Sequence, residues 1–99
     1  MTFKLVGFDE SGVKQSRGND NLRLVCLIEG GGKLAIWGRL GSSQNIEDVQ
    51  KAGMPCVVEC DCIPPPDTWA IKFGHSYWVP QDKNLRVLDA PLPRKATHY

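Results

Sequence analysis

Apolar residues recur at every second position in several short stretches of the chain, which is the spacing of a β-strand with one buried face. These stretches are residues 3–8, 22–28, 33–40, 54–63 and 85–88. Three consecutive glycines, residues 30–32, predict a tight hairpin turn, because glycine readily adopts the positive φ angles that such turns need. The pattern therefore predicts a mainly β protein.

One short helix is predicted between two of these strands. Ser43 or Asn45 can cap its N-terminus, residues 46–52 form its body, and Gly53 follows its end. Residues 9–20 contain glycine, serine and asparagine and are expected to form a loop or an irregular hairpin tip.

The last third of the chain is predicted to hold a second hairpin, with strands at residues 69–73 and 77–79. Pro64, Pro65 and Pro66 precede it as a rigid connector, because proline lacks the N–H that a sheet ladder needs. Residues 1–89 are expected to form one domain, and residues 90–99 a frayed tail.

Composition fits one folded, soluble domain of 99 residues. The chain has 12 basic and 11 acidic residues, for a net charge of +1, so binding to nucleic acid would need a local basic patch. Apolar runs are too short for a membrane span, and the N-terminal segment carries charges where a signal peptide needs apolar residues. The protein is therefore predicted to be cytoplasmic and not to bind a membrane.

The order of these elements resembles the OB-fold, a five-stranded Greek-key barrel with a helix between its third and fourth strands. The resemblance covers residues 2–88. It is closest in residues 33–40 and the following helix, which look like the third strand and helix of single-stranded-DNA-binding OB domains. It implies a small OB-like barrel of about five strands.

In OB domains that bind single strands, aromatic side chains stack bases while lysines and arginines contact phosphates. Trp37 shares a strand face with Lys33 and Arg39, and Arg23 on the preceding strand is expected to point the same way. Together with Lys4, they form a basic and aromatic surface. This surface predicts binding of single-stranded DNA or RNA with little sequence preference. The alternative for Trp37 is packing against the long loop or a second subunit.

The second predicted hairpin supplies another candidate surface, a loop that clasps an extended nucleic acid. Alternation assigns residues 69–73 to the core on one face, so the accessible members are expected to be Lys72, His75, Tyr77 and Trp78. Packing of these aromatic residues as a lid over the end of a barrel is the alternative.

The four cysteines are predicted to be free thiols that pack as small apolar side chains. Cys56, Cys60 and Cys62 have a C-x3-C-x-C spacing that does not match zinc sites, so no metal or other cofactor is predicted.

The chain carries no recognisable catalytic motif, and an enzyme is not expected. A small enzyme or ligand-binding barrel that uses His75 with Glu59 or Asp61 is the least favoured alternative.

The main rival function is a protein-interaction module. In this interpretation the barrel forms a homodimer or docks on a protein partner through its aromatics, with Val25 and Leu27 completing an apolar patch around Trp37. A homodimer with a nucleic-acid groove across both subunits would satisfy both interpretations.

Overall fold

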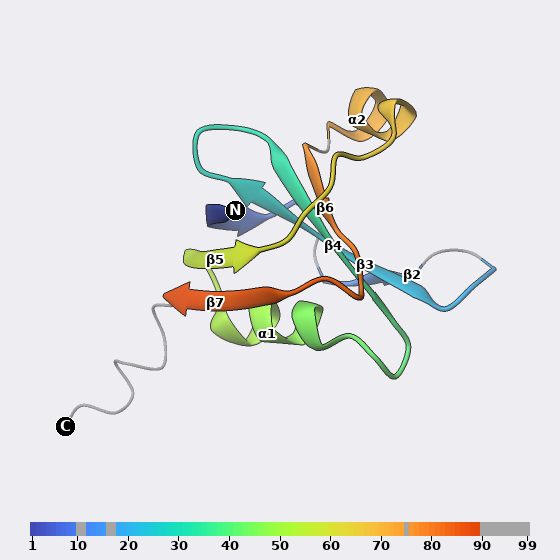
Figure 1. Ribbon diagram of the computed structural model, residues 1–99, viewed down its shortest axis with the longest axis horizontal. Coiled ribbons are helices and arrows are strands. Elements are labelled where there is room, and N and C mark those ends of the chain that lie inside the picture. Colours follow the sequence, from blue (N-terminus) through green and yellow to red (C-terminus); the bar gives the residue numbers. More distant parts are fainter. Residues whose placement is uncertain (10–11, 16–17, 75, 90–99) are drawn as a thin grey trace.

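The computed structural model describes residues 1–9, 12–15, 18–74 and 76–89. Its strands form one sheet in the order β6-β4-β3-β1-β5-β7, with β2 pairing beside β3 (Figure 1). The elements are β1 (Thr2–Phe8), β2 (Lys14–Gln15), β3 (Asn21–Ile28), β4 (Lys33–Arg39), α1 (Gln44–Ala52), β5 (Cys56–Cys60), α2 (Asp67–Phe73), β6 (Tyr77–Val79) and β7 (Leu85–Asp89). The predicted mainly β class is confirmed, and the sheet curls into a barrel-like shape.

Strand pairing follows the alternation of the sequence. β3 and β4 form the predicted hairpin, with Leu27 opposite Lys33, and Gly31 in the turn has a φ of 120°. β1 pairs antiparallel with both β3 and β5, which brings distant segments into one ladder. β6 runs parallel to β4, and β7 runs antiparallel to β5. The last strands therefore connect the two sides of the curled sheet.

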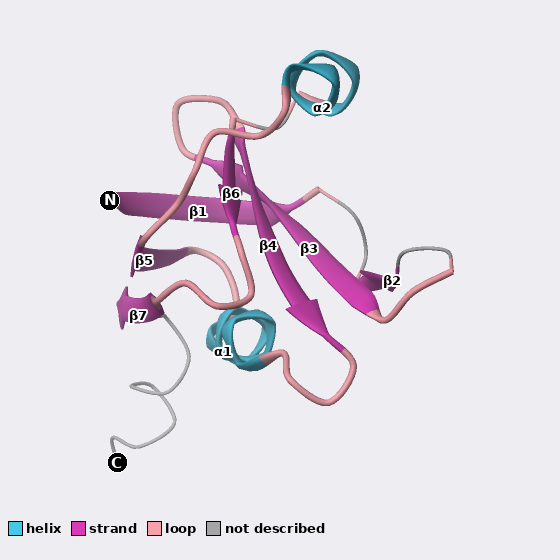
Figure 2. Cartoon of the chain, turned by 45° about the vertical axis from the view of Figure 1, so that its right-hand side comes forward, coloured by secondary structure: helices cyan, strands magenta, loops and turns pink. Residues whose placement is uncertain are grey.

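The core lies on the concave side of this sheet, where the apolar phase of each strand points inward. Fully buried side chains come from every main strand, for example Leu5, Leu24, Ile36 and Val58. Helix α1 closes one end with Ile46 and Val49, and Figure 2 shows α1 and α2 at opposite ends of the sheet. Burial of each such aliphatic side chain stabilises the fold by roughly 1.5–3 kcal/mol before entropic costs.

Gly38 lets α1 approach β4 closely. A Cβ atom at this position would lie 2.9 Å from Cβ of Ser43 and 3.2 Å from Cδ1 of Ile46. Ser43 is the N-cap residue of α1, and its hydroxyl donates a hydrogen bond to Glu47 Oε2 at 3.0 Å. The glycine therefore fixes the start of the helix against the end of β4, beside Arg39.

The predicted strand at residues 69–73 is wrong, because this segment is helix α2. Asp67 lies in its first turn and Lys72 in its last, where their charges favour the helix dipole. Gly74 ends the helix in the left-handed conformation, with its N–H donating to the carbonyl of Ala70. The expected core position Ile71 is 85% exposed. These capping signals outweigh the strand-like alternation, so the expectation of a single helix is also wrong.

The number of strands also differs from the expected five. The described residues contain seven strands, because Lys14–Gln15 adds a short strand in the predicted loop and because the predicted strands at residues 77–79 and 85–88 are two separate strands, β6 and β7. As a result α1 follows the fourth strand in chain order. The expected tail at residues 90–99 lies outside the described residues. Within the described part, no helix has the length and apolarity needed to cross a membrane.

Candidate functional site

The three tryptophans of the chain meet on the face of β4 opposite the core. Trp37 comes from β4, Trp69 from α2 and Trp78 from β6. Their ring centroids are 5.1 Å apart for Trp37 and Trp78, 5.5 Å for Trp69 and Trp78, and 5.9 Å for Trp37 and Trp69. All three pairs are edge-to-face, the arrangement that aromatic quadrupoles favour. We call these three residues the tryptophan cluster.

Backbone pairing holds Trp78 in place within this cluster. In the parallel ladder Trp78 lies opposite Ala35, two residues before Trp37. Trp78 and Ile63 also exchange two backbone hydrogen bonds of 2.8 Å, which tie the segment after β5 to β6. The cluster therefore joins three parts of the chain that are distant in sequence.

Arg23 covers part of this cluster with a cation. Its Cζ lies 5.9 Å from the Trp37 ring centroid and 5.3 Å from that of Trp69, within the range of cation–π attraction. Arg23 and Trp37 are direct partners in the β3–β4 ladder, so the prediction that they share one face is confirmed. Trp37 therefore packs on one side against residues of α2, β6 and β3, rather than against the long loop that the alternative prediction named.

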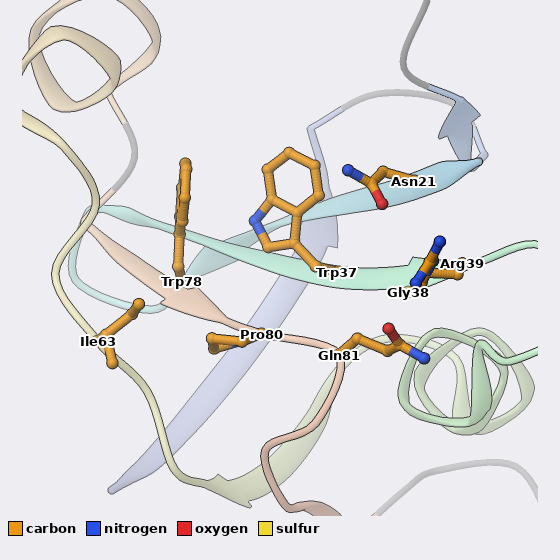
Figure 3. Close-up of a pocket in the computed structure, with 8 residues that line it drawn as sticks. All are labelled: Asn21, Trp37, Gly38, Arg39, Ile63, Trp78, Pro80 and Gln81. Carbon is orange, nitrogen blue, oxygen red and sulfur yellow. The ribbon is translucent and has the colours of Figure 1, made fainter. Parts of the chain in front are cut away.

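A pocket of about 370 Å³ opens beside the tryptophan cluster (Figure 3). Its lining residues are Asn21, Trp37, Gly38, Arg39, Ile63, Trp78, Pro80 and Gln81. The indoles with Ile63 and Pro80 form an apolar wall, while Asn21, Arg39 and Gln81 bring polar groups to the other side. An apolar pocket of this size with a few convergent polar groups is typical of small-ligand sites.

The indole N–H groups of Trp37 and Trp78 are buried and have no hydrogen-bond acceptor in the described part of the chain. In Figure 3 the Trp37 nitrogen lies on the side of its ring that faces Trp78. An N–H directed at an aromatic face makes a weak attraction, which offsets only part of the cost of its burial. The two indoles are therefore fixed by ring packing rather than by conventional hydrogen bonds.

Lys4 and Lys33, which were predicted to contact phosphates, each form an ion pair with a carboxylate of the protein. Lys33 Nζ is 3.2 Å from Asp9 Oδ2, and Lys4 Nζ is 3.3 Å from Glu29 Oε2. Both pairs are partly exposed, and such pairs contribute only about 0–1 kcal/mol to stability. Arg39, by contrast, is exposed at the edge of the pocket.

The second predicted surface is divided by the structure. Tyr77 packs inward, with its ring centroid 5.0 Å from that of Phe3, whereas Trp78 belongs to the tryptophan cluster. Lys72 is exposed on α2, and His75 lies outside the described residues. The pocket thus unites Trp37 and Arg39 with only Trp78 from the second set.

Trp69, Asn21 and Gln81 were not predicted as site residues from the sequence. The helix-capping signals around α2 would have placed Trp69 on a helix, and Asn21 has the same strand parity as Arg23. Gln81 carries no local signal, because it reaches the pocket through the tertiary fold.

The apolar patch of Val25 and Leu27 that was predicted around Trp37 for a protein-interaction module is also corrected, because Val25 is only 2% exposed.

The cysteines lie away from this pocket. Cys26, Cys56 and Cys60 are buried free thiols, and Cys62 is half-buried. Burial, with a smaller contribution from nearby Cys56, raises the pKa of Cys26 to about 12. Burial likewise raises the pKa of Cys60 to about 11. The four thiols thus behave as packing groups, and the described residues contain no cluster of three or more metal-ligand side chains.

Comparisons of this chain with models of protein families, with curated proteins and with solved structures find no match.

Proposed function

We propose that this protein binds single-stranded nucleic acid on the face of β3 and β4 that carries the tryptophan cluster. The observation that carries the proposal is the pocket of about 370 Å³ in which two indoles form one wall and Arg39 lies at the edge. Aromatic surface beside a cation suits a base and its phosphate, and stacking accepts any base. A base would enter the pocket beside Trp37 and Trp78, since Arg23 and Trp69 cover other parts of Trp37.

The order of elements supports this proposal. The short strand β2, which pairs only with β3, can be left out of the count, and β6 and β7 can be counted together as one interrupted strand. Five strands then remain: β1, β3, β4, β5 and the combined β6–β7. Helix α1 then lies between the third and fourth strands, as in the OB-fold. The interrupted last strand pairs with both β4 and β5, which links the two sides of the sheet.

The place of the pocket fits the same comparison. OB domains bind oligonucleotides across their second and third strands, with help from the loop before the last strand. Here those strands are β3 and β4, and the corresponding connection carries α2 and Trp69. The tryptophan cluster lies where the two meet.

The charge distribution predicts modest affinity. The net charge is +1, and Lys4 and Lys33 are neutralised by carboxylates in the free protein. Binding would therefore rely on a few phosphate contacts, and its salt dependence would be correspondingly shallow.

Salt-dependent binding of a labelled oligothymidine tests the proposal. We expect Arg39→Gln to weaken binding and to reduce the slope of log affinity against log salt by about 0.7, the value for one phosphate contact on a single strand. Lys51→Gln is the matched control, because Lys51 is exposed in the last turn of α1 and outside the pocket lining. Fluorescence anisotropy with the full chain measures both. Absence of saturable binding at low salt, or an unchanged slope in Arg39→Gln, would contradict the proposal.

A second candidate is a protein-interaction module, favoured by one observation. Ile71 is 85% exposed on α2, and a large apolar side chain at such a position suits contact with a partner or a second copy. Light scattering on the full chain tests this candidate. A dimer that Ile71→Ser converts to a monomer would support it, and a monomeric wild type would argue against self-association.

A further inference from the structure

Three polar side chains converge on the pocket from separate parts of the chain. Asn21 begins β3, Arg39 ends β4, and Gln81 follows β6. Asn21 and Arg39 are direct partners in the β3–β4 ladder, so both lie on the same face as Trp37. The pocket therefore offers hydrogen-bonding groups in addition to the aromatic surface that non-selective stacking needs.

The hydrogen-bonding character of two of these groups is fixed. Gln81 Nε2 donates to Ser42 Oγ at 3.0 Å and to the Ser42 carbonyl at 3.4 Å, so the oxygen of this carboxamide is left as an acceptor. Figure 3 shows that oxygen on the side of Gln81 toward β4. Arg39 can only donate, whereas the Asn21 carboxamide can donate and accept. A ligand must therefore present acceptors to Arg39 and donors to Gln81.

The four nucleobases differ in how well they meet this requirement. Guanine has two acceptors, O6 and N7, for a forked arginine, beside two donors, N1–H and the N2 amino group, for a carboxamide oxygen. Cytosine and adenine each have a single donor group, and thymine or uracil has one donor between two acceptors. Guanine and adenine, as purines, also have a larger ring system than the pyrimidines for contact with the indoles.

Resting on the nucleic-acid binding proposed above, we infer that the pocket is a guanine-selective base site within an otherwise tolerant single-strand surface. In a strand without guanine Arg39 contacts a phosphate, as proposed above. At a guanine it donates instead to O6 and N7 of the base, while Gln81 accepts from the N1–H and N2 amino groups. Asn21 completes the polar edge beside Arg39, and Trp37 with Trp78 contacts the ring.

The test uses oligothymidines of equal length in which one central nucleotide is thymidine, deoxyguanosine, deoxycytidine or deoxyadenosine. A single guanine per strand keeps the strands from associating with one another. We expect the guanine strand to bind about tenfold more tightly than the all-thymidine strand, the usual size of one bidentate base contact. Deoxyinosine, which lacks the N2 amino group, should lose a large part of that preference.

The variant Gln81→Met tests whether the preference for guanine over inosine depends on the contact between Gln81 and the N2 amino group. In this variant guanine and inosine strands should bind equally, because the acceptor for the N2 amino group is gone. Gln50→Met on α1 is the control and should retain the wild-type guanine-to-inosine ratio, since Gln50 lies outside the pocket lining. Circular dichroism checks that both variants are folded.

The outcomes separate the two proposals. Equal affinity for all four central bases, or a guanine-to-inosine ratio that Gln81→Met leaves unchanged, would overturn the guanine site and leave single-strand binding standing. Failure of the wild-type protein to bind any of the strands would overturn both.

Discussion

The guanidinium carbon of Arg23 lies 5.3 Å from the centroid of the Trp69 ring, so a cation from β3 rests on an aromatic ring from α2. α2 lies at the end of the sheet away from α1 and is joined to β5 through a run of three prolines. The contacts of Trp69 with Arg23, Trp37 and Trp78 thus hold this helix at the end of the sheet.

Replacing Arg23 tests how much the cation contributes. Arg23→Met keeps a long apolar stem but removes the charge over Trp37 and Trp69, so the free energy of unfolding should fall by about 1 kcal/mol. Urea denaturation measures the change. Arg86→Met is the control: Arg86 pairs with Glu59 on the surface, with its side chain 71% exposed, and its loss should change stability little. Equal effects of the two substitutions would contradict a special role for Arg23.

Trp69 is expected to hold α2 in place. Trp69→Ala removes two edge-to-face contacts and the ring beneath Arg23, while the strands of the sheet keep their own core. In limited digestion, trypsin should then cleave after Lys72 several times faster than in the wild-type protein, because local opening of α2 becomes easier. Ile71→Ala should leave the rate unchanged, since Ile71 is 85% exposed. An unaltered cleavage rate in Trp69→Ala would show that other contacts hold the helix.

A methyl group at Gly38 should strain the junction between β4 and α1. Its Cβ would lie 2.9 Å from Cβ of Ser43 and 3.1 Å from the Ser43 Cα, which belongs to the backbone. Gly38→Ala is therefore expected to destabilise the protein by about 1–3 kcal/mol, the usual cost of overpacking. Gly7→Ala is the control, because its nearest neighbour is a side-chain atom at 3.7 Å. Thermal or urea unfolding distinguishes the two.

Stability should decline in alkaline solution through the buried thiols. Burial raises the pKa of Cys26 from its ordinary value of 9.0 to about 12. Above pH 9 the unfolded chain therefore releases this proton while the folded chain retains it, and the free energy of unfolding falls as pH rises. In urea titrations between about pH 8 and pH 11, Cys26→Ala should be less stable at the lower pH but should lose less stability across the range. Parallel curves for the two proteins would rule out this contribution.

The parts of the fold that the sequence predicted are those decided by local pattern. The hairpin of β3 and β4 follows from a continuous apolar phase on each strand and from glycines in the turn, and α1 follows from its flanking residues. Trp69, Ile71 and Phe73 alternate as in a strand, and that alternation concealed α2. Here the prolines before the helix and Gly74 after it were the stronger signals.

Only the site residues whose placement depends on the alternation of side chains along β3 and β4 could be predicted from the sequence. Parity places Arg23 beside Trp37, and the ladder confirms that pairing. Lys4 and Lys33 were predicted as part of the basic surface that contacts phosphates, but their acidic partners Glu29 and Asp9 come from other segments and could not be assigned from the sequence. Gln81 enters the pocket through the path of the chain after β6, which no local pattern records.

The gathering of every tryptophan at one place has a spectroscopic consequence. The three indoles of the chain lie 5.1–5.9 Å apart, close enough for their electronic transitions to couple. The tryptophan contribution to near-ultraviolet circular dichroism and to the intrinsic emission of the unlabelled protein would therefore arise from this one cluster, without background from tryptophans elsewhere. The protein thus carries its own optical probe at the surface where its ligand is expected to bind.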